Sequence, residues 1–144
     1  MIRKAMVNDS GMIHDLCVND LGYECDGELV RKRLEGLDPE RECVFVAVAD
    51  DRIAGFIHVE KYEVLYCQGM ANILGLAVAK NYRRQGIGGK LLTEAEKWAA
   101  SMGLPMVRLN SGMTRKEAHT FYRNMGYDNE KEQMRFLKTL KAGE

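Results

Sequence analysis

Residues 71–102 read ANILGLAVAKNYRRQGIGGKLLTEAEKWAASM, and they contain the most informative pattern in the chain. The first part, residues 71–79, is an apolar run too short for a typical helix and typical of a buried strand. A glycine-rich turn follows at residues 83–89, and a helix N-terminus there would present free backbone N–H groups and the positive end of the helix dipole. The sequence therefore predicts a site for a phosphate-bearing cofactor. Apolar residues then recur at helical spacing, namely Ile87, Leu91, Leu92, Ala95, Trp98, Ala99 and Met102.

The turn matches one phosphate-binding pattern and fails two others. A P-loop would need Gly where Arg84 stands and Ser or Thr where Leu91 stands. The Rossmann fingerprint starts at Gly86 and Gly88 but meets Leu91 where it needs a third glycine. The pattern Arg/Gln-x-x-Gly-x-Gly/Ala is matched in full by Arg83, Gly86 and Gly88. It resembles the pyrophosphate loop of the GNAT family of N-acetyltransferases, which bind acetyl-coenzyme A. The alternative is a charged strand–helix turn whose glycines serve only its geometry.

A second segment, residues 114–127, makes the resemblance more specific. It is similar to the family's Ala-x-x-Phe-Tyr-x-x-x-Gly-Phe/Tyr signature and follows a strand-like run at residues 106–110, as in the family. Thr114 and Glu117 predict a capping box at the start of a short helix, and Gly126 predicts a C-cap at its end. The apolar face of this helix carries Ala118, Phe121, Tyr122 and Met125. Its tyrosine is either a catalytic hydroxyl or a core side chain.

Length and composition predict one globular domain over residues 1–144. Hydrophobic residues make up 46% and charged residues 29%. Lys plus Arg and Asp plus Glu each total 21, so the formal net charge is zero, which argues against a nucleic-acid or membrane-surface partner. The N-terminus lacks the apolar core of a signal peptide, and no run approaches transmembrane length. No metal-binding spacing is present, and reduced thiols in a cytoplasmic protein are expected from Cys17, Cys25, Cys43 and Cys67.

Shorter patterns predict the remaining elements. The polar cluster at residues 8–10 offers a cap for a helix carrying Leu16, and Asp26 offers one for a helix that ends before Pro39. A hairpin turns at residues 50–52. The order β-α-α-β-β-β-α-β-α-β resembles the GNAT fold, an α/β (α+β) arrangement with a mixed, mostly antiparallel sheet of six to seven strands and about four flanking helices. Besides the strand at 71–79, strands are predicted at residues 2–6, 43–49, 53–60, 106–110 and 133–137.

The resemblance implies that an acetyl group moves from acetyl-CoA, as co-substrate, directly to a primary amine of a small molecule or peptide. Backbone groups at residues 76–78 would hold pantetheine and polarise the thioester carbonyl. Tyr122 would protonate the departing thiolate, because a tyrosine with a pKa near ~10 carries its proton at neutral pH. The implied cofactor contacts are Leu76, Ala77, Val78, Arg83, Arg84, Gln85, Gly86, Ile87, Gly88, Gly89 and Tyr122.

Two positions depart from the family pattern. Many relatives carry a catalytic glutamate in the strand before the turn, about where this chain has Leu74. Glu60 and Glu63 are the candidate substitutes, and an ordinary surface carboxylate is the alternative for each. Many relatives also place a pantetheine-binding asparagine where this chain has Arg115. Asn110 is then the candidate to make that contact, with Arg115 beside the cofactor.

The connection between the first two helices, residues 19–28, is where the family largely builds its acceptor site. Its carboxylates surround Tyr23 and could attract a cationic amine, although they equally fit a solvated loop. A homodimer is compatible with the resemblance. The alternative function is a non-catalytic acyl-CoA-binding or sensing module, against which Tyr122 argues because binding alone needs no proton donor. The four acids of the connection are Asp20, Glu24, Asp26 and Glu28.

Overall fold

The computed structural model describes residues 1–141. Contacts divide the chain into two compact units, of which the first covers Met1–Asn110 and the second begins at Ser111. Each unit has its own arrangement of elements. The single domain expected over residues 1–144 stays a prediction.

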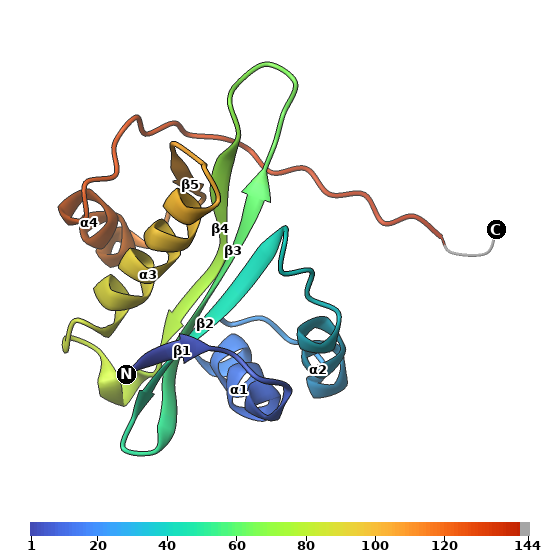
Figure 1. The fold of residues 1–144 in the computed structure, drawn as a ribbon, viewed down its shortest axis with the longest axis vertical. Helices are drawn as coiled ribbons and strands as arrows, with labels where there is room; N and C mark the ends of the chain where they lie inside the picture. Colours follow the sequence, from blue (N-terminus) through green and yellow to red (C-terminus); the bar gives the residue numbers. More distant parts are fainter. Residues whose placement is uncertain (142–144) are drawn as a thin grey trace. The chain divides into compact units, whose positions relative to one another are not determined.

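The first unit contains a five-stranded sheet in the order β1-β2-β3-β4-β5 (Figure 1). Neighbouring strands are antiparallel, except that β4 and β5 run parallel. The predicted hairpin is confirmed: Asp50 and Asp51 have positive φ values of 53° and 59°, which suit a tight turn between twisted strands. The strands are β1 (Ile2–Lys4), β2 (Glu42–Ala49), β3 (Arg52–Tyr62), β4 (Met70–Val78) and β5 (Val107–Leu109).

One face of the sheet packs against α1 (Ser10–Asn19) and α2 (Gly27–Glu35). Side chains alternate between the faces of a strand, so Val44 and Val46 of β2 point to the same side as Phe56 of β3. Apolar side chains of both helices close this core. Its buried residues are Ile13, Leu16, Val44, Val46, Ile53, Phe56 and Ala77, with Val30 and Leu34 of α2 packed against them.

The opposite face packs against α3 (Ile87–Ser101), the helix predicted after the glycine-rich turn. Gly55 of β3 packs closely against α3, because a Cβ built on it would be 3.1 Å from the Leu91 Cδ1 atom. A 3-10 turn, η2 (Lys80–Tyr82), leads from β4 to the glycine-rich turn. The buried stripe of α3 consists of Leu91, Leu92, Ala95, Trp98 and Ala99.

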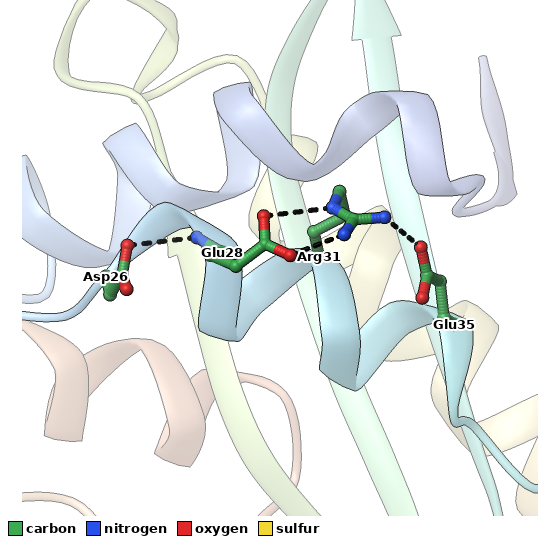
Figure 2. Close-up of polar contacts among 4 residues, drawn as sticks. All are labelled: Asp26, Glu28, Arg31 and Glu35. Carbon is green, nitrogen blue, oxygen red and sulfur yellow. Dashed lines mark hydrogen bonds and ion pairs between the residues drawn. The ribbon is translucent and has the colours of Figure 1, made fainter.

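The sequence signals at the start of α2 are confirmed. The Asp26 carboxylate accepts a hydrogen bond from the Glu28 backbone N–H at 3.1 Å, as an N-cap does (Figure 2). Arg31 then donates to the carboxylates of Glu28 and Glu35, one turn before and one turn after it. Such pairs at helical spacing support an exposed helix face.

The cap predicted for α1 is wrong. Asp9 stands at the N-cap position, but its carboxylate makes no capping hydrogen bond. It accepts two hydrogen bonds from the Arg3 guanidinium, at 2.8 and 3.0 Å, and one from the Met6 N–H at 2.7 Å. Two charged donors outweigh the single neutral N–H that a cap would supply. A short 3-10 turn, η1 (Val7–Asp9), precedes the helix.

The second unit contains α4 (Lys116–Asn124). The predicted capping box is wrong. The Arg115 N–H donates to the Gly112 carbonyl in a turn, and the helix begins only at Lys116, so Thr114 lies outside it. The predicted C-cap is confirmed. Gly126 has a φ of 93°, and the Tyr127 N–H donates to the Tyr122 carbonyl at 3.0 Å, which is the bond of a Schellman ending.

The sheet has five strands rather than the six to seven expected, and the strand predicted at residues 133–137 is absent from the described chain. A strand needs a neighbouring strand to hydrogen-bond with, and residues 133–137 are not part of any strand in the structure. Met134 and Phe136 are accordingly about four-fifths exposed, at 80% and 85%. Within residues 1–141, no helix combines the length and apolar character needed to cross a bilayer.

Candidate active site

The glycine-rich turn places unused backbone N–H groups at the start of α3. Arg84 and Gly86 both have positive φ, 65° and 79°, and Gly86 is the N-cap of the helix. The first intrahelical bond runs from the Lys90 N–H to the Gly86 carbonyl. The N–H groups of residues 87–89 therefore lack helical acceptors, and the N-cap residue Gly86 has no side chain to cap them. A Cβ at Gly86 would meet no atom within 4 Å, so the turn is open to a ligand. These features fit a pyrophosphate.

The two arginines of the turn differ in their partners. The Arg83 Nε donates to the Val78 carbonyl at 3.1 Å, and its terminal nitrogen pairs with the Asp20 carboxylate at 3.1 Å. The Asp20 side chain is only 12% exposed. Arg84 is exposed and makes no ion pair within residues 1–141. The charge of Arg83 is thus already balanced, whereas that of Arg84 faces solvent.

The second half of β4 has a free edge beside this turn. β5 pairs with β4 only over Ala71–Ile73, although β4 continues to Val78. Along this half β4 keeps its pairing with β3, apart from a bulge at Leu74, whose side chain is 49% exposed. Half of the backbone groups at residues 76–78 therefore point away from β3 toward the unpaired edge. This edge can accept an extended chain in the manner of an added strand.

Polar side chains cluster on the face of the sheet that also carries α1. The Asn72 amide donates to a Glu60 oxygen at 2.8 Å and accepts from Arg108 at 2.8 Å. Arg108 also donates to the Asn110 side chain at 3.2 Å, and its guanidinium carbon lies 4.5 Å from the centroid of the Tyr62 ring. The structure thus brings two predicted site residues, Glu60 and Asn110, into one network, the sheet-face cluster.

Sequence reasoning missed four members of this region. Asn72 and Arg108 join the sheet-face cluster through strand register, and His58 bonds Glu42 at 2.8 Å on the same face. Glu42 lies directly opposite Glu60. One signal was available: Arg108 interrupts the apolar strand Val107–Leu109 with a charge.

The second unit holds the other two predicted site residues. Arg115 is the N-cap of α4 and is exposed, and Tyr122 lies in the last turn of that helix. Burial raises the pKa of the Tyr122 hydroxyl, and the nearby Arg115 charge opposes this rise. The ring packs edge-on against Phe121 and Tyr127, with centroids 5.2 and 6.1 Å away. The Tyr122 hydroxyl therefore keeps its proton at physiological pH.

The acids between α1 and α2 are largely engaged within the first unit. Asp20 pairs with Arg83, Asp26 caps α2, and Glu28 pairs with Arg31. The second candidate base, Glu63, pairs with Arg41 at 3.4 Å. Residues 1–141 contain no group of three or more acidic, histidine or cysteine side chains that could hold a metal ion.

Comparisons with known proteins cover nearly the whole chain. The Acetyltransferase (GNAT) family matches residues 11–127. Aminoalkylphosphonate N-acetyltransferase from Salmonella typhimurium (strain LT2) is 28% identical over 142 residues, covering 96% of this chain and 90% of that protein. An uncharacterized N-acetyltransferase from Bacillus subtilis (strain 168) is 31% identical over 118 residues, covering 76% of this chain and 79% of that protein. The structure of aminoglycoside acetyltransferase meta-AAC0020, from an uncultured soil metagenomic sample, superposes with a TM-score of 0.80 and 28% identity, covering 98% and 96%.

These matches agree with the geometry of the turn and of the β4 edge. The family match runs from α1 to the residue after Gly126, and so includes the glycine-rich turn and the helix of the Phe-Tyr signature. The aminoalkylphosphonate and aminoglycoside relatives are both acetyltransferases. The chain therefore belongs to the acetyltransferase (GNAT) family.

Proposed function

We propose that this enzyme moves an acetyl group from acetyl-CoA directly to a primary amine of a small molecule. The proposal rests above all on the left-handed Gly86 at the N-terminus of α3, next to the unpaired edge of β4. An anion on the free N–H groups of residues 87–89 would leave the rest of an extended cofactor free to follow that edge. The family uses acetyl-CoA, the cofactor that has this shape.

The backbone of residues 76–78 has two tasks in this proposal. It hydrogen-bonds pantetheine, and one of its N–H groups polarises the thioester carbonyl as negative charge develops on the oxygen. Gln85 through Gly89 hold the pyrophosphate. Arg84, which has no carboxylate partner in residues 1–141, supplies charge more readily than Arg83, which would first have to leave Asp20. Asn110 and Arg115 are proposed as further contacts with the cofactor.

Tyr122 is proposed as the acid that protonates the departing thiolate. The raised pKa of its hydroxyl keeps the proton in place until the carbon–sulfur bond breaks. Glu60 is proposed as the base that takes a proton from the attacking amine. Its carboxylate accepts only one hydrogen bond from a side chain described here, that of Asn72, and so retains basic lone pairs.

The acceptor is proposed to be a small molecule rather than a peptide. Two relatives support this class, since one acetylates aminoalkylphosphonates and the other is an aminoglycoside acetyltransferase. The cysteines at 17, 25, 43 and 67 are all free thiols, which fits the proposed cytoplasmic location. A homodimer stays a prediction.

The deciding experiment is a thiol-release assay with acetyl-CoA and a panel of primary amines. Release of CoA thiol is expected only when an acceptor amine is present. Tyr122→Phe should lower kcat by on the order of 10²- to 10⁴-fold while the Kd for acetyl-CoA holds. Tyr66→Phe is the matched control, because Tyr66 is 86% exposed at the tip of the β3–β4 loop. Tight acetyl-CoA binding without thiol release on any amine would instead identify a binding module.

A further inference from the structure

The sheet-face cluster holds two opposite charges apart. Glu60 and Arg108 both contact Asn72, yet they do not pair with each other. No ion pair within residues 1–141 involves either residue. Arg108 is half-buried, and its partners among the described residues are two amide oxygens and the Tyr62 ring. A carboxylate and a guanidinium kept separate by an amide each retain their attraction for an outside ion.

The acidic end of the cluster contains a second, unfavourable arrangement. Glu42 and Glu60 lie directly opposite each other on β2 and β3. Like charges in that position destabilise a sheet. His58 bonds to Glu42 and Asn72 to Glu60, so each carboxylate is anchored, but no Lys or Arg in residues 1–141 pairs with either. The position between them favours a cation.

The register places the two ends along one line across the sheet. Glu42 faces Glu60, Glu60 faces Asn72, and Asn72 faces Arg108, so all four side chains share one face. On the same face, α1 and α2 pack against the apolar cluster that contains Val44, Val46 and Phe56. Negative charge therefore stands at the β2–β3 end of this line and positive charge at its β5 end.

We infer that the sheet-face cluster is the acceptor site and that the acceptor is a small zwitterion, a primary amine that carries a phosphonate or carboxylate. The anion lies on Arg108, whose fork of N–H donors suits either group. The amine lies toward Glu60 and Glu42. Asn72 is a positioning residue that prevents Glu60 from collapsing onto Arg108. This inference rests on the proposed acetyl transfer and adds the charge pattern of its substrate.

The test compares amines of similar length with the wild-type enzyme. 2-Aminoethylphosphonate and β-alanine carry the anion, n-propylamine lacks it, and an aminoglycoside offers several cations instead. Both kcat/KM and the Kd measured by calorimetry in the presence of CoA are recorded. We expect at least one of the two zwitterions to exceed n-propylamine by tenfold or more in kcat/KM and in affinity. The ratio between the two zwitterions then identifies phosphonate or carboxylate as the preferred group.

Arg108→Gln should lower kcat/KM for the zwitterion at least tenfold by raising its KM. The kcat/KM for n-propylamine should stay within twofold of the wild-type value. Lys61→Gln is the matched control, because it removes a positive charge from the next residue after Glu60 in β3, which points to the opposite face. Equal or better use of n-propylamine or the aminoglycoside by the wild type would overturn the zwitterion site and leave the transferase intact. Zwitterion binding without turnover would keep the site and refute the transferase.

Discussion

At the scale of single residues, Gly55 is the position where the close packing of β3 can be tested. A Cβ there would lie 2.7 Å from the Ala77 carbonyl oxygen, a rigid backbone atom. Gly55→Ala should therefore lower the free energy of unfolding by about 1–3 kcal/mol, measured by urea denaturation. Gly11→Ala is the control, because nothing lies within 4 Å of its Cβ position and it sits in α1, where Ala should add about 0.5–1 kcal/mol. Equal midpoints for the two variants would contradict the tight contact.

The Arg3–Asp9 pair predicts a pH dependence of stability. Hydrogen bonds from Arg3 lower the pKa of the Asp9 carboxyl below its usual value. The pair therefore stabilises the folded chain fully above the unfolded pKa of about 3.9, and this contribution is lost as the pH falls through the lower folded pKa. Asp9→Asn should lower the free energy of unfolding by about 1–3 kcal/mol at pH 7. It should also weaken the fall of that free energy with pH below pH 4. Asp15→Asn, at a side chain that is 72% exposed, should change neither.

The sequence predicted the structural roles of some residues better than those of others. Asp26 and Gly126 were recognisable because a cap depends on residues within one helical turn. Asp9 misled, since its stronger partner Arg3 belongs to another element. Asn72 and Arg108 could not be placed beside Glu60, because strand register is set by the whole sheet rather than by local spacing.

At the scale of elements, one ion pair joins the α1–α2 connection to the glycine-rich turn. Asp20 neutralises Arg83, so Asp20→Asn should leave more positive charge at the turn. The Kd for acetyl-CoA should then fall about fivefold at low salt, which corresponds to a Coulomb energy of ~1 kcal/mol, and the gain should shrink as salt rises. Isothermal calorimetry at two ionic strengths measures it. The exposed Glu24 provides the control, and Glu24→Gln should leave the Kd unchanged. An unchanged Kd with a raised acceptor KM in Asp20→Asn would favour amine recruitment by this connection.

Elements that have a strong hydrophobic pattern of their own were predicted correctly. The strand that would have needed a distant partner strand was predicted wrongly. The apolar stripe of α3 and the nearly continuous apolar runs of β2 and β3 identify these elements locally. Residues 133–137 also have a strand-like pattern, but the pattern does not say which edge of the sheet would receive them, and the structure shows no strand pairing there. The hydrophobic pattern of a segment predicts which element the segment can form. Strand pairing also requires a free sheet edge of matching length.

At the scale of the molecule, the chain as a whole supplies little charge to guide an anionic cofactor. Its formal net charge is zero, so long-range steering is weak and recognition depends on local groups. The turn at residues 83–89 must then carry most of the affinity for a pyrophosphate, through N–H groups at the start of α3 and the helix dipole. A negative charge introduced into that turn should abolish binding rather than weaken it slightly.

Thermal unfolding with and without acetyl-CoA tests this dependence. At one hundred times Kd the ligand should stabilise the unit that holds the turn by about 2.7 kcal/mol, which corresponds to a rise of roughly 5–10 °C in Tm. Gly88→Glu puts a side chain and a carboxylate at the second residue of α3 and should abolish the rise. Gly11→Glu is the matched control, since Gly11 is the second residue of α1 and no atom lies within 4 Å of its Cβ position. If both variants and the wild type gain equally in Tm, acetyl-CoA binds elsewhere, and the free N–H groups of α3 serve only the geometry of the turn.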